Sequence, residues 1–68
     1  VDSLQIAQAI AALPARYREV LLLRYDNGYT VPEIASLLSM TQAGVKKTIQ
    51  RARGRLERIL TEQEVQPQ

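Results

Sequence analysis

The chain has 68 residues, 46% of them hydrophobic and 24% charged, a composition typical of one small folded domain. It contains no cysteine and no histidine, which excludes disulfides and thiol nucleophiles and removes the usual zinc ligands and the commonest general base. We therefore expect no enzyme, no metal site and no cofactor. No apolar run approaches the ~20 residues that cross a bilayer, so no membrane segment is expected.

The net charge of +2 is unevenly distributed along the chain. Residues 1–40 hold three basic and four acidic residues, whereas residues 41–68 hold six basic and three acidic ones. All six cations of the second half lie within positions 46–58. This asymmetry suggests a polyanionic partner for the second half, although a charged helix face is often merely solvated.

Apolar spacing and one proline predict the first two helices. Asp2-Ser3 offers an N-cap, and the helix that follows would carry an apolar face of Ile6, Ala9, Ile10 and Leu13. A proline interrupts this pattern and suits a first helical turn, so a second helix is expected from about Pro14 to Tyr25. Its inner face should carry Tyr17, Val20, Leu21 and Arg24, with Leu22 on the opposite side. We expect both Tyr17 and Tyr25 to pack in the core or at its edge.

A turn and a capping box should precede the third helix. Asp26-Asn27-Gly28 stops the second helix, with Asn27 or Gly28 free to adopt a positive φ. The segment Thr30-Val31-Pro32-Glu33 then starts the next helix, since Thr30 and Glu33 can cap reciprocally and Pro32 needs no hydrogen bond there. This third helix is short, and Ser39-Met40 should connect it tightly to the fourth.

The fourth helix is predicted to be long, with Thr41 as its cap. Apolar residues recur at spacings of four, three, four and three along one buried stripe: Val45, Ile49, Ala52, Leu56 and Ile59. Beyond it, residues 61–68 have one apolar side chain and are expected to form a flexible polar tail. The sequence thus predicts an all-α domain of four helices over residues 1–60.

Two helices joined by about three residues, the second long and basic, form a helix-turn-helix pattern. If the apolar stripe faces inward, five residues of the last helix point outward: Lys47, Gln50, Arg51, Gly54 and Arg58. Ala43 joins that face and Lys46 and Arg53 flank it. Such a helix fits the major groove of DNA, and its N-terminus at Thr41 favours a phosphate. The alternative is a helical protein-interaction domain whose basic face binds an acidic partner. Cations at such spacings, such as Arg53 with Glu57, also often form mere surface pairs.

One set of residues, kept in spacing through both loops, resembles a known family. They are Leu13-Pro14, Arg18-Glu19-Val20-Leu21, Arg24-Tyr25, Gly28-Tyr29-Thr30, Glu33-Ile34-Ala35, Leu38, Val45-Lys46, Arg51-Ala52-Arg53 and Leu56. This set is similar to region 4 of bacterial RNA polymerase sigma factors, in particular the extracytoplasmic-function (ECF) group, over about residues 4–60. The Glu-Ile-Ala segment alone is shared with LuxR-type regulators, which leaves a LuxR-type DNA-binding domain as the first alternative.

The resemblance implies a cytoplasmic bacterial domain that binds the promoter −35 element as double-stranded DNA. It also implies docking on the β flap of RNA polymerase and occlusion by an anti-sigma factor. The groove-facing positions of the family fall on Gln42, Ala43, Lys46, Lys47, Gln50 and Arg51, and phosphate contacts are expected from Thr41 and Arg53. Leu22 is either a single exposed apolar residue or part of a partner surface.

The chain departs from the family at the start of the last helix. Where ECF members usually have Gly-Thr-Val, this sequence has Ala43-Gly44-Val45. The missing threonine hydroxyl removes one polar contact, and a glycine weakens the first helical turn. The family's promoter-melting domain is absent from this sequence, and the chain begins at Val1 rather than at methionine, so we expect it to be a piece of a longer protein.

Overall fold

The computed structural model describes residues 3–64 and contains four α-helices, with no strand in that range. The helices are α1 (Ser3–Ala11), α2 (Ala15–Leu21), α3 (Val31–Leu38) and α4 (Gln42–Glu64). A π-helical segment, η1 (Leu22–Asp26), continues α2 directly. The predicted all-α fold of four helices is confirmed.

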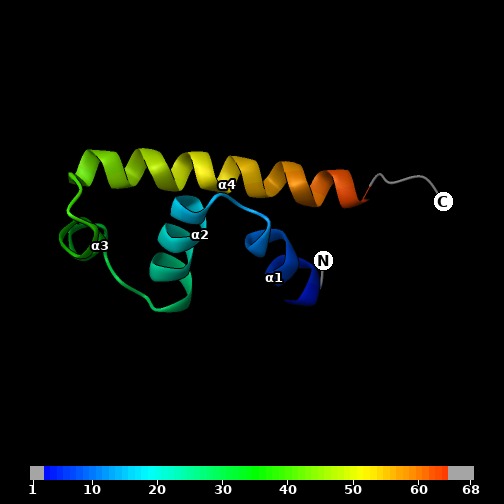
Figure 1. Cartoon of the computed structure of the whole chain (residues 1–68), viewed down its shortest axis with the longest axis horizontal. Coiled ribbons are helices and arrows are strands. Elements are labelled where there is room, and N and C mark those ends of the chain that lie inside the picture. The colour runs from blue at the N-terminus through cyan, green and yellow to red at the C-terminus, as the bar shows by residue number, and fades with distance from the viewer. Residues whose placement is uncertain (1–2, 65–68) are drawn as a thin grey trace.

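The longest helix, α4, forms one whole side of the molecule (Figure 1). Its 23 residues extend about 34 Å, which accounts for most of the 45 Å long axis. The other three helices lie along the same side of α4, with α2 in the middle, α3 near its N-terminal end and α1 towards its C-terminal end (Figure 1). One face of α4 is therefore covered, and the opposite face is left to solvent.

Two apolar clusters hold the helices against α4. The first joins α2, α3 and the N-terminal half of α4 through Val20, Ile34, Ala35, Val45 and Ile49. The second joins the α1–α2 connection, α2 and the middle of α4 through Leu13, Leu21 and Ala52, with Tyr17, Leu56 and Ile59 packed against it. The predicted inward stripe of α4 is confirmed, and its last two members are partly buried rather than fully enclosed.

The second helix ends differently from the prediction. The chain widens into a π turn after Leu21, in which the Asn27 amide donates to the Leu22 carbonyl at 3.0 Å. Gly28 then has φ +75°, which agrees with the prediction that Asn27 or Gly28 adopts a positive φ. Because a π turn holds more residues than an α turn, the side-chain register shifts over η1. Tyr25 is 58% exposed, so its predicted packing role is wrong, whereas Tyr17 is half-buried as expected.

The predicted capping box at the start of α3 is present. The Glu33 amide donates to the Thr30 hydroxyl at 3.2 Å, and the Thr30 amide donates to the Glu33 carboxylate at 2.8 Å. Pro32 lies in the first turn, where the missing N–H leaves no bond unmade. Two otherwise unpaired backbone donors are satisfied, and the first residue of α3 is fixed.

The connection between α3 and α4 is a tight left-handed turn. Ser39 has φ 54° and ψ 45°, and the Met40 amide donates to the Ala35 carbonyl at 2.9 Å. This is the Schellman arrangement that commonly ends a helix. The Thr41 hydroxyl then accepts from the Gly44 amide at 2.9 Å, which confirms the predicted cap of α4.

Glycine at position 44 is matched to this cap. A methyl group on Gly44 would lie 3.0 Å from the Thr41 hydroxyl oxygen, closer than side-chain carbons normally approach an oxygen. Gly54, in the same helix, has nothing within 4 Å of such a methyl group. The residue that weakens the first turn of α4 thus also leaves room for the oxygen that caps it.

Both ends of the described chain differ in part from the predicted elements. The α4 helix continues to Glu64, so residues 61–64 of the expected tail are helical. The helix can continue because residues 60–64 contain no glycine or proline, and the next helix-breaking residue is Pro67. Residues 65–68 of that tail and the expected cap at Asp2 lie outside the described residues. The first helix ends at Ala11, and Leu13 is buried while Ile6 is 38% exposed.

The burial of Ile49 yields a prediction about stability. Ile49→Ala should lower the free energy of unfolding by ~2–5 kcal/mol, because it removes apolar contacts and leaves a cavity between α2, α3 and α4. That is a large part of the total expected for a domain of this size. Leu37→Ala, at a 58% exposed position, is the control and should change the free energy of unfolding by less than ~0.5 kcal/mol. Equal thermal shifts for the two variants would contradict the assigned inner face.

The two glycines of α4 give a second stability prediction. Gly54→Ala should stabilise the chain by ~1 kcal/mol, because alanine favours the helix and the site is open. Gly44→Ala should gain less, because the new methyl group displaces the capping hydroxyl. In a Thr41→Ala background, Gly44→Ala should recover the missing gain. Denaturant unfolding of these variants measures the coupling, and strictly additive effects would show that the cap and the glycine are independent.

Candidate DNA-binding surface

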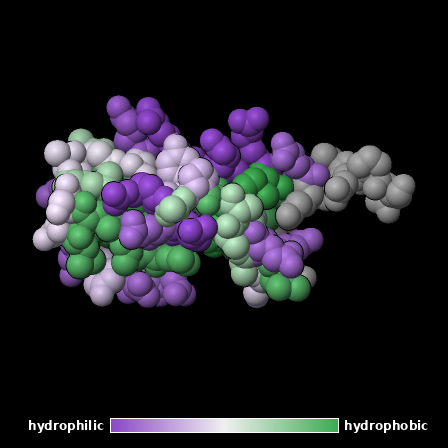
Figure 2. Space-filling view, in the orientation of Figure 1, coloured by the Kyte–Doolittle hydropathy of each residue, from purple (hydrophilic) through white to green (hydrophobic). Residues whose placement is uncertain are grey.

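All six predicted groove-facing residues are exposed and lie within the first ten residues of α4. They are Gln42, Ala43, Lys46, Lys47, Gln50 and Arg51. Figure 2 shows hydrophilic side chains along the outer edge of this helix, on the side away from the other helices. The exposure that DNA contact requires is present, and the contact itself stays a prediction.

Packing sets the rotation of α4 about its axis. Val45 and Ala52 are completely buried and Ile49 is 9% exposed, so their side of the helix faces α2 and α3. At 3.6 residues per turn, Lys47 and Gln50 then fall on the side opposite this stripe. Lys46 and Arg53 lie on one flank, and Arg51 lies on the other.

The cations of α4 are not neutralised by neighbouring carboxylates. Among the described side chains the structure records one ion pair, between Arg16 and Glu19 at 3.4 Å on the surface of α2. The pair considered between Arg53 and Glu57 is not formed. Lys46, Lys47, Arg51, Arg53, Arg55 and Arg58 therefore present an uncompensated positive field on the outer side of α4, which attracts polyanions.

The two residues expected to contact phosphates have different surroundings. Thr41 is exposed, and although its hydroxyl oxygen accepts from the Gly44 amide, the O–H group can still donate to a phosphate. Arg53 is exposed and lines a cleft with residues of two other elements. One of those is Arg24 of η1, which the sequence analysis had placed on the buried face of the second helix.

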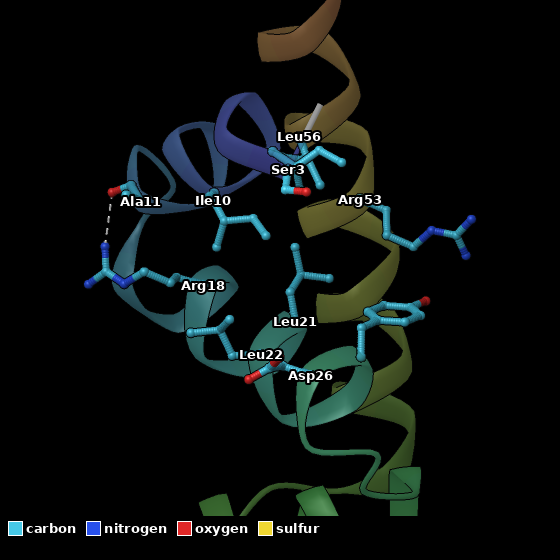
Figure 3. Close-up of a pocket in the computed structure, with 12 residues that line it drawn as sticks. Ser3, Ile10, Ala11, Arg18, Leu21, Leu22, Asp26, Arg53 and Leu56 are labelled. Carbon is cyan, nitrogen blue, oxygen red and sulfur yellow. Dashed lines mark hydrogen bonds between the residues drawn. The ribbon is translucent and has the colours of Figure 1, made fainter. Parts of the chain in front are cut away.

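An apolar groove lies between α1, α2, η1 and the middle of α4, and Arg53 lines both this groove and the cleft described above. We define it by its largest apolar side chains: Ile6, Ile10, Leu21, Leu22, Tyr25 and Leu56. Figure 3 shows Ile10 and Leu21 pointing into the space between their helices. Leu22, 40% exposed, is thus part of a continuous apolar surface, and sequence spacing within single helices could not reveal this.

One arginine ties α1 to α2 at the edge of this groove. The Arg18 guanidinium donates to the Ala11 carbonyl at 3.2 Å (Figure 3) and also to the Leu13 carbonyl at 3.4 Å. The Ala11 carbonyl is one of those that the end of α1 leaves without a helical partner, and Leu13 lies in the connection that follows. Arg18 therefore acts as a side-chain cap that ties the end of α1 and this connection to α2.

Neither a metal-binding group of side chains nor a membrane-spanning helix is found within residues 3–64. No group of three or more acidic, cysteine or histidine side chains comes together there in a way that could hold a metal ion. No helix in that range is both long and apolar enough to cross a membrane.

The sequence matches one protein family and two curated relatives. The family model described as "Sigma-70, region 4" matches residues 3–56. A probable RNA polymerase sigma factor, RfaY of Xanthomonas campestris, is 44% identical over 46 residues, which are 68% of this chain and 12% of the relative. The RNA polymerase sigma factor SigZ of Bacillus subtilis is 36% identical over 55 residues, which are 81% of this chain and 31% of the relative.

The chain thus spans less than a third of the length of either relative. No solved structure matches it significantly. The family match includes α1, α2, α3 and α4 as far as Leu56, with five of the six cations of the exposed basic face. The chain therefore belongs to the sigma-70 region 4 family, as region 4 of a sigma factor of the extracytoplasmic-function type.

Proposed function

We propose that this domain binds the promoter −35 element in the bacterial cytoplasm and directs RNA polymerase to it, without catalysing a reaction. The observation that carries the proposal is the rotation of α4. Its apolar stripe is buried against α2 and α3, so the six cations at positions 46–58 lie on exposed parts of its surface. Because the chain belongs to the sigma-70 region 4 family, we infer that the polyanion bound by this surface is promoter DNA.

The exposed side chains of α4 have the chemistry to read base edges in the major groove. Lysine and arginine donate to the guanine O6 and N7 atoms, and glutamine pairs with adenine N6 and N7. Lys47 and Gln50 lie on the outermost side of the helix, and Arg51 lies next to them. Ala43 adds a small apolar surface that suits a thymine methyl group. These four residues are proposed to carry the base preference.

The N-terminus of α4 is proposed to anchor the helix on a phosphate. The Gly44 amide is bonded to the Thr41 hydroxyl, whereas the structure gives no partner for the amides of Gln42 and Ala43. Free amides and the helix dipole together favour an anion at this end. A phosphate there would set the depth at which Lys46 and Lys47 enter the groove.

The apolar groove is proposed to be the surface that meets RNA polymerase. It lies on the α1 side of the molecule, lined mainly by residues of α1, α2 and η1, so a protein seated in it would leave Lys47 and Gln50 free. An apolar surface of this kind on a small domain commonly marks a protein partner. The β flap and an anti-sigma factor are the two partners that the family implies.

Family membership favours this function over the LuxR-type alternative. The protein-interaction alternative would use the same basic face for an acidic protein. It predicts binding without base preference and equal affinity for any flexible polyanion of similar charge. Sequence preference among DNA duplexes separates the two.

The first functional prediction concerns salt. Affinity for duplex DNA should fall linearly on a log–log plot against salt concentration, because each phosphate neutralised by α4 releases counterions. We expect a slope that corresponds to roughly three to five phosphates, since only part of the helix can lie in the groove. Fluorescence anisotropy between ~50 and 200 mM salt measures this slope. An affinity that does not change with salt would rule out the electrostatic basis of the proposal.

The second functional prediction separates base contacts from phosphate contacts. A preferred duplex is first selected by the chain from a random-sequence library, and a scrambled duplex serves as reference. Lys47→Ala or Arg51→Ala should cost ~1–3 kcal/mol on the preferred duplex and relax discrimination at one or two base pairs. Both residues lie in the first three turns of α4, the part of such a helix that reaches base edges.

Arg58→Ala is the matched control on the same helix. Arg58 lies two turns beyond Arg51, where α4 should already leave the groove. Its replacement should weaken both duplexes equally or change neither. If Arg58→Ala alters sequence preference while Lys47→Ala and Arg51→Ala do not, the proposed orientation of α4 on DNA is wrong.

A further inference from the structure

Two threonine side chains bind the backbone of the same glycine at the start of α4. The Thr41 hydroxyl accepts from the Gly44 amide at 2.9 Å, and the Thr48 hydroxyl donates to the Gly44 carbonyl at 2.8 Å. Gly44 is thus held on one side by the residue that caps α4 and on the other by a residue one turn further along. We call this pair of hydrogen bonds the threonine clamp.

The clamp acts on the most flexible point in the first turn of α4. Glycine has no Cβ, so its backbone reaches more conformations than that of any other residue and weakens a helix. Gly44 is the third residue of α4, and it joins Gln42 and Ala43 to the rest of the helix. Without a restraint at Gly44, the first turn would be free to move relative to Lys47 and the residues beyond it.

Thr48 itself is poorly placed to contact DNA. It lies three residues after the buried Val45, which puts it about 60° from that residue around the helix axis and at the edge of the apolar stripe. Its side chain is half-buried. A hydroxyl has one hydrogen, and that of Thr48 is donated to the Gly44 carbonyl rather than to a phosphate or a base.

We propose that Thr48 is a positioning residue for DNA recognition, which fixes the direction of the first turn of α4 by holding the Gly44 carbonyl. This inference rests on the proposed function and adds a residue that influences base preference without touching DNA. A hydroxyl bonded to the carbonyl four residues earlier commonly bends a helix, and glycine offers little resistance to such a bend. The orientation of Gln42 and Ala43 relative to Arg51 then depends on one hydrogen bond.

The competing explanation is that the bond only satisfies the hydroxyl of a half-buried threonine. In a helix the Gly44 carbonyl already accepts from the Thr48 amide, so this carbonyl needs no second donor. Gly54 is the other glycine of α4, and among the described residues the structure records no side-chain hydrogen bond to it. The two bonds therefore fall on the glycine that lies in the turn proposed to meet DNA.

The test replaces the hydroxyl without changing the shape of the side chain. Thr48→Val keeps a β-branched residue and removes the donor. It should reduce discrimination by ~3–10-fold at one or two base pairs of the selected duplex, and these pairs should differ from those that respond to Arg51→Ala. Affinity for the scrambled duplex and the salt slope should stay the same, because no charge is removed.

Two further variants serve as controls for this substitution. Thr48→Ser retains a hydroxyl and should discriminate between duplexes as the unaltered chain does. Thr61→Val makes the same chemical change at an exposed position near the end of α4 and should alter nothing. If Thr48→Val weakens every duplex by the same factor, its role is only in stability and the proposal is overturned.

A double-mutant cycle shows whether Thr48 acts through Gly44. Alanine restricts the backbone at position 44 by itself, so in a Gly44→Ala background the hydroxyl of Thr48 should be dispensable. Thr48→Val should then change base discrimination by less than ~2-fold, against ~3–10-fold in the unaltered chain. Equal effects in the two backgrounds would show that Thr48 does not act through the glycine and would overturn the proposal.

Amide hydrogen exchange measures the clamp without DNA. Thr48→Val should speed exchange at Gly44 and Val45 by ~3–10-fold, because the first turn opens more often. Exchange at the buried Val20 and Ala52 should not change, which separates local loosening from global unfolding. Unchanged exchange at Gly44 and Val45 would contradict a restraint by Thr48.

The outcomes also separate this inference from the proposed function. If the unaltered chain prefers one duplex and Thr48→Val keeps the same preference at every base pair, the positioning role fails and the function stands. If the unaltered chain shows no preference among duplexes, the proposed function fails and the positioning role fails with it, whatever the exchange rates at Gly44.

Discussion

The burial of one apolar stripe on α4 is the constraint on which the rest of the structure depends. Val45, Ile49 and Ala52 pack against α2 and α3, so the helix cannot rotate about its axis without exposing them to water. Because the rotation of α4 is fixed, the positions of the outward-facing residues, three or four apart along the helix, are fixed as well. The same contacts therefore stabilise a small domain and orient the side chains that are proposed to read DNA.

The turn before α4 fixes the direction in which the helix leaves α3 and the residue at which it begins. The left-handed Ser39 and the bond from Met40 to Ala35 set the direction of the chain, and the Thr41 cap sets the residue at which the helix begins. A start one residue later would rotate the outer face by about 100° relative to the turn. Local caps thus have a functional consequence, because they determine which side chains lie at the exposed N-terminal end of α4.

Features that depend on one helix could be predicted from the sequence, and features shared between helices could not. The stripe of α4, the capping box at Thr30 and the cap at Thr41 each follow from spacing or from residues three apart. The π turn of η1 has no comparable signal, and it changed the expected surroundings of Tyr25 and Arg24. The apolar groove and the cleft that Arg53 lines beside Arg24 are each formed by residues of at least three elements, so the apolar spacing within one element could not predict either of them.

The departure at Ala43-Gly44-Val45 links the cap to base preference. A larger residue at position 44 would place its first side-chain carbon 3.0 Å from the Thr41 oxygen, so this chain combines a threonine cap with a glycine three residues later. In the proposed function, position 44 then offers no side chain to DNA, and base preference would come from Ala43 beside it and from Lys47, Gln50 and Arg51, one to two turns further along. Because those base contacts would be few, the phosphate contacts proposed for Thr41 and Arg53 would have to hold the helix in register.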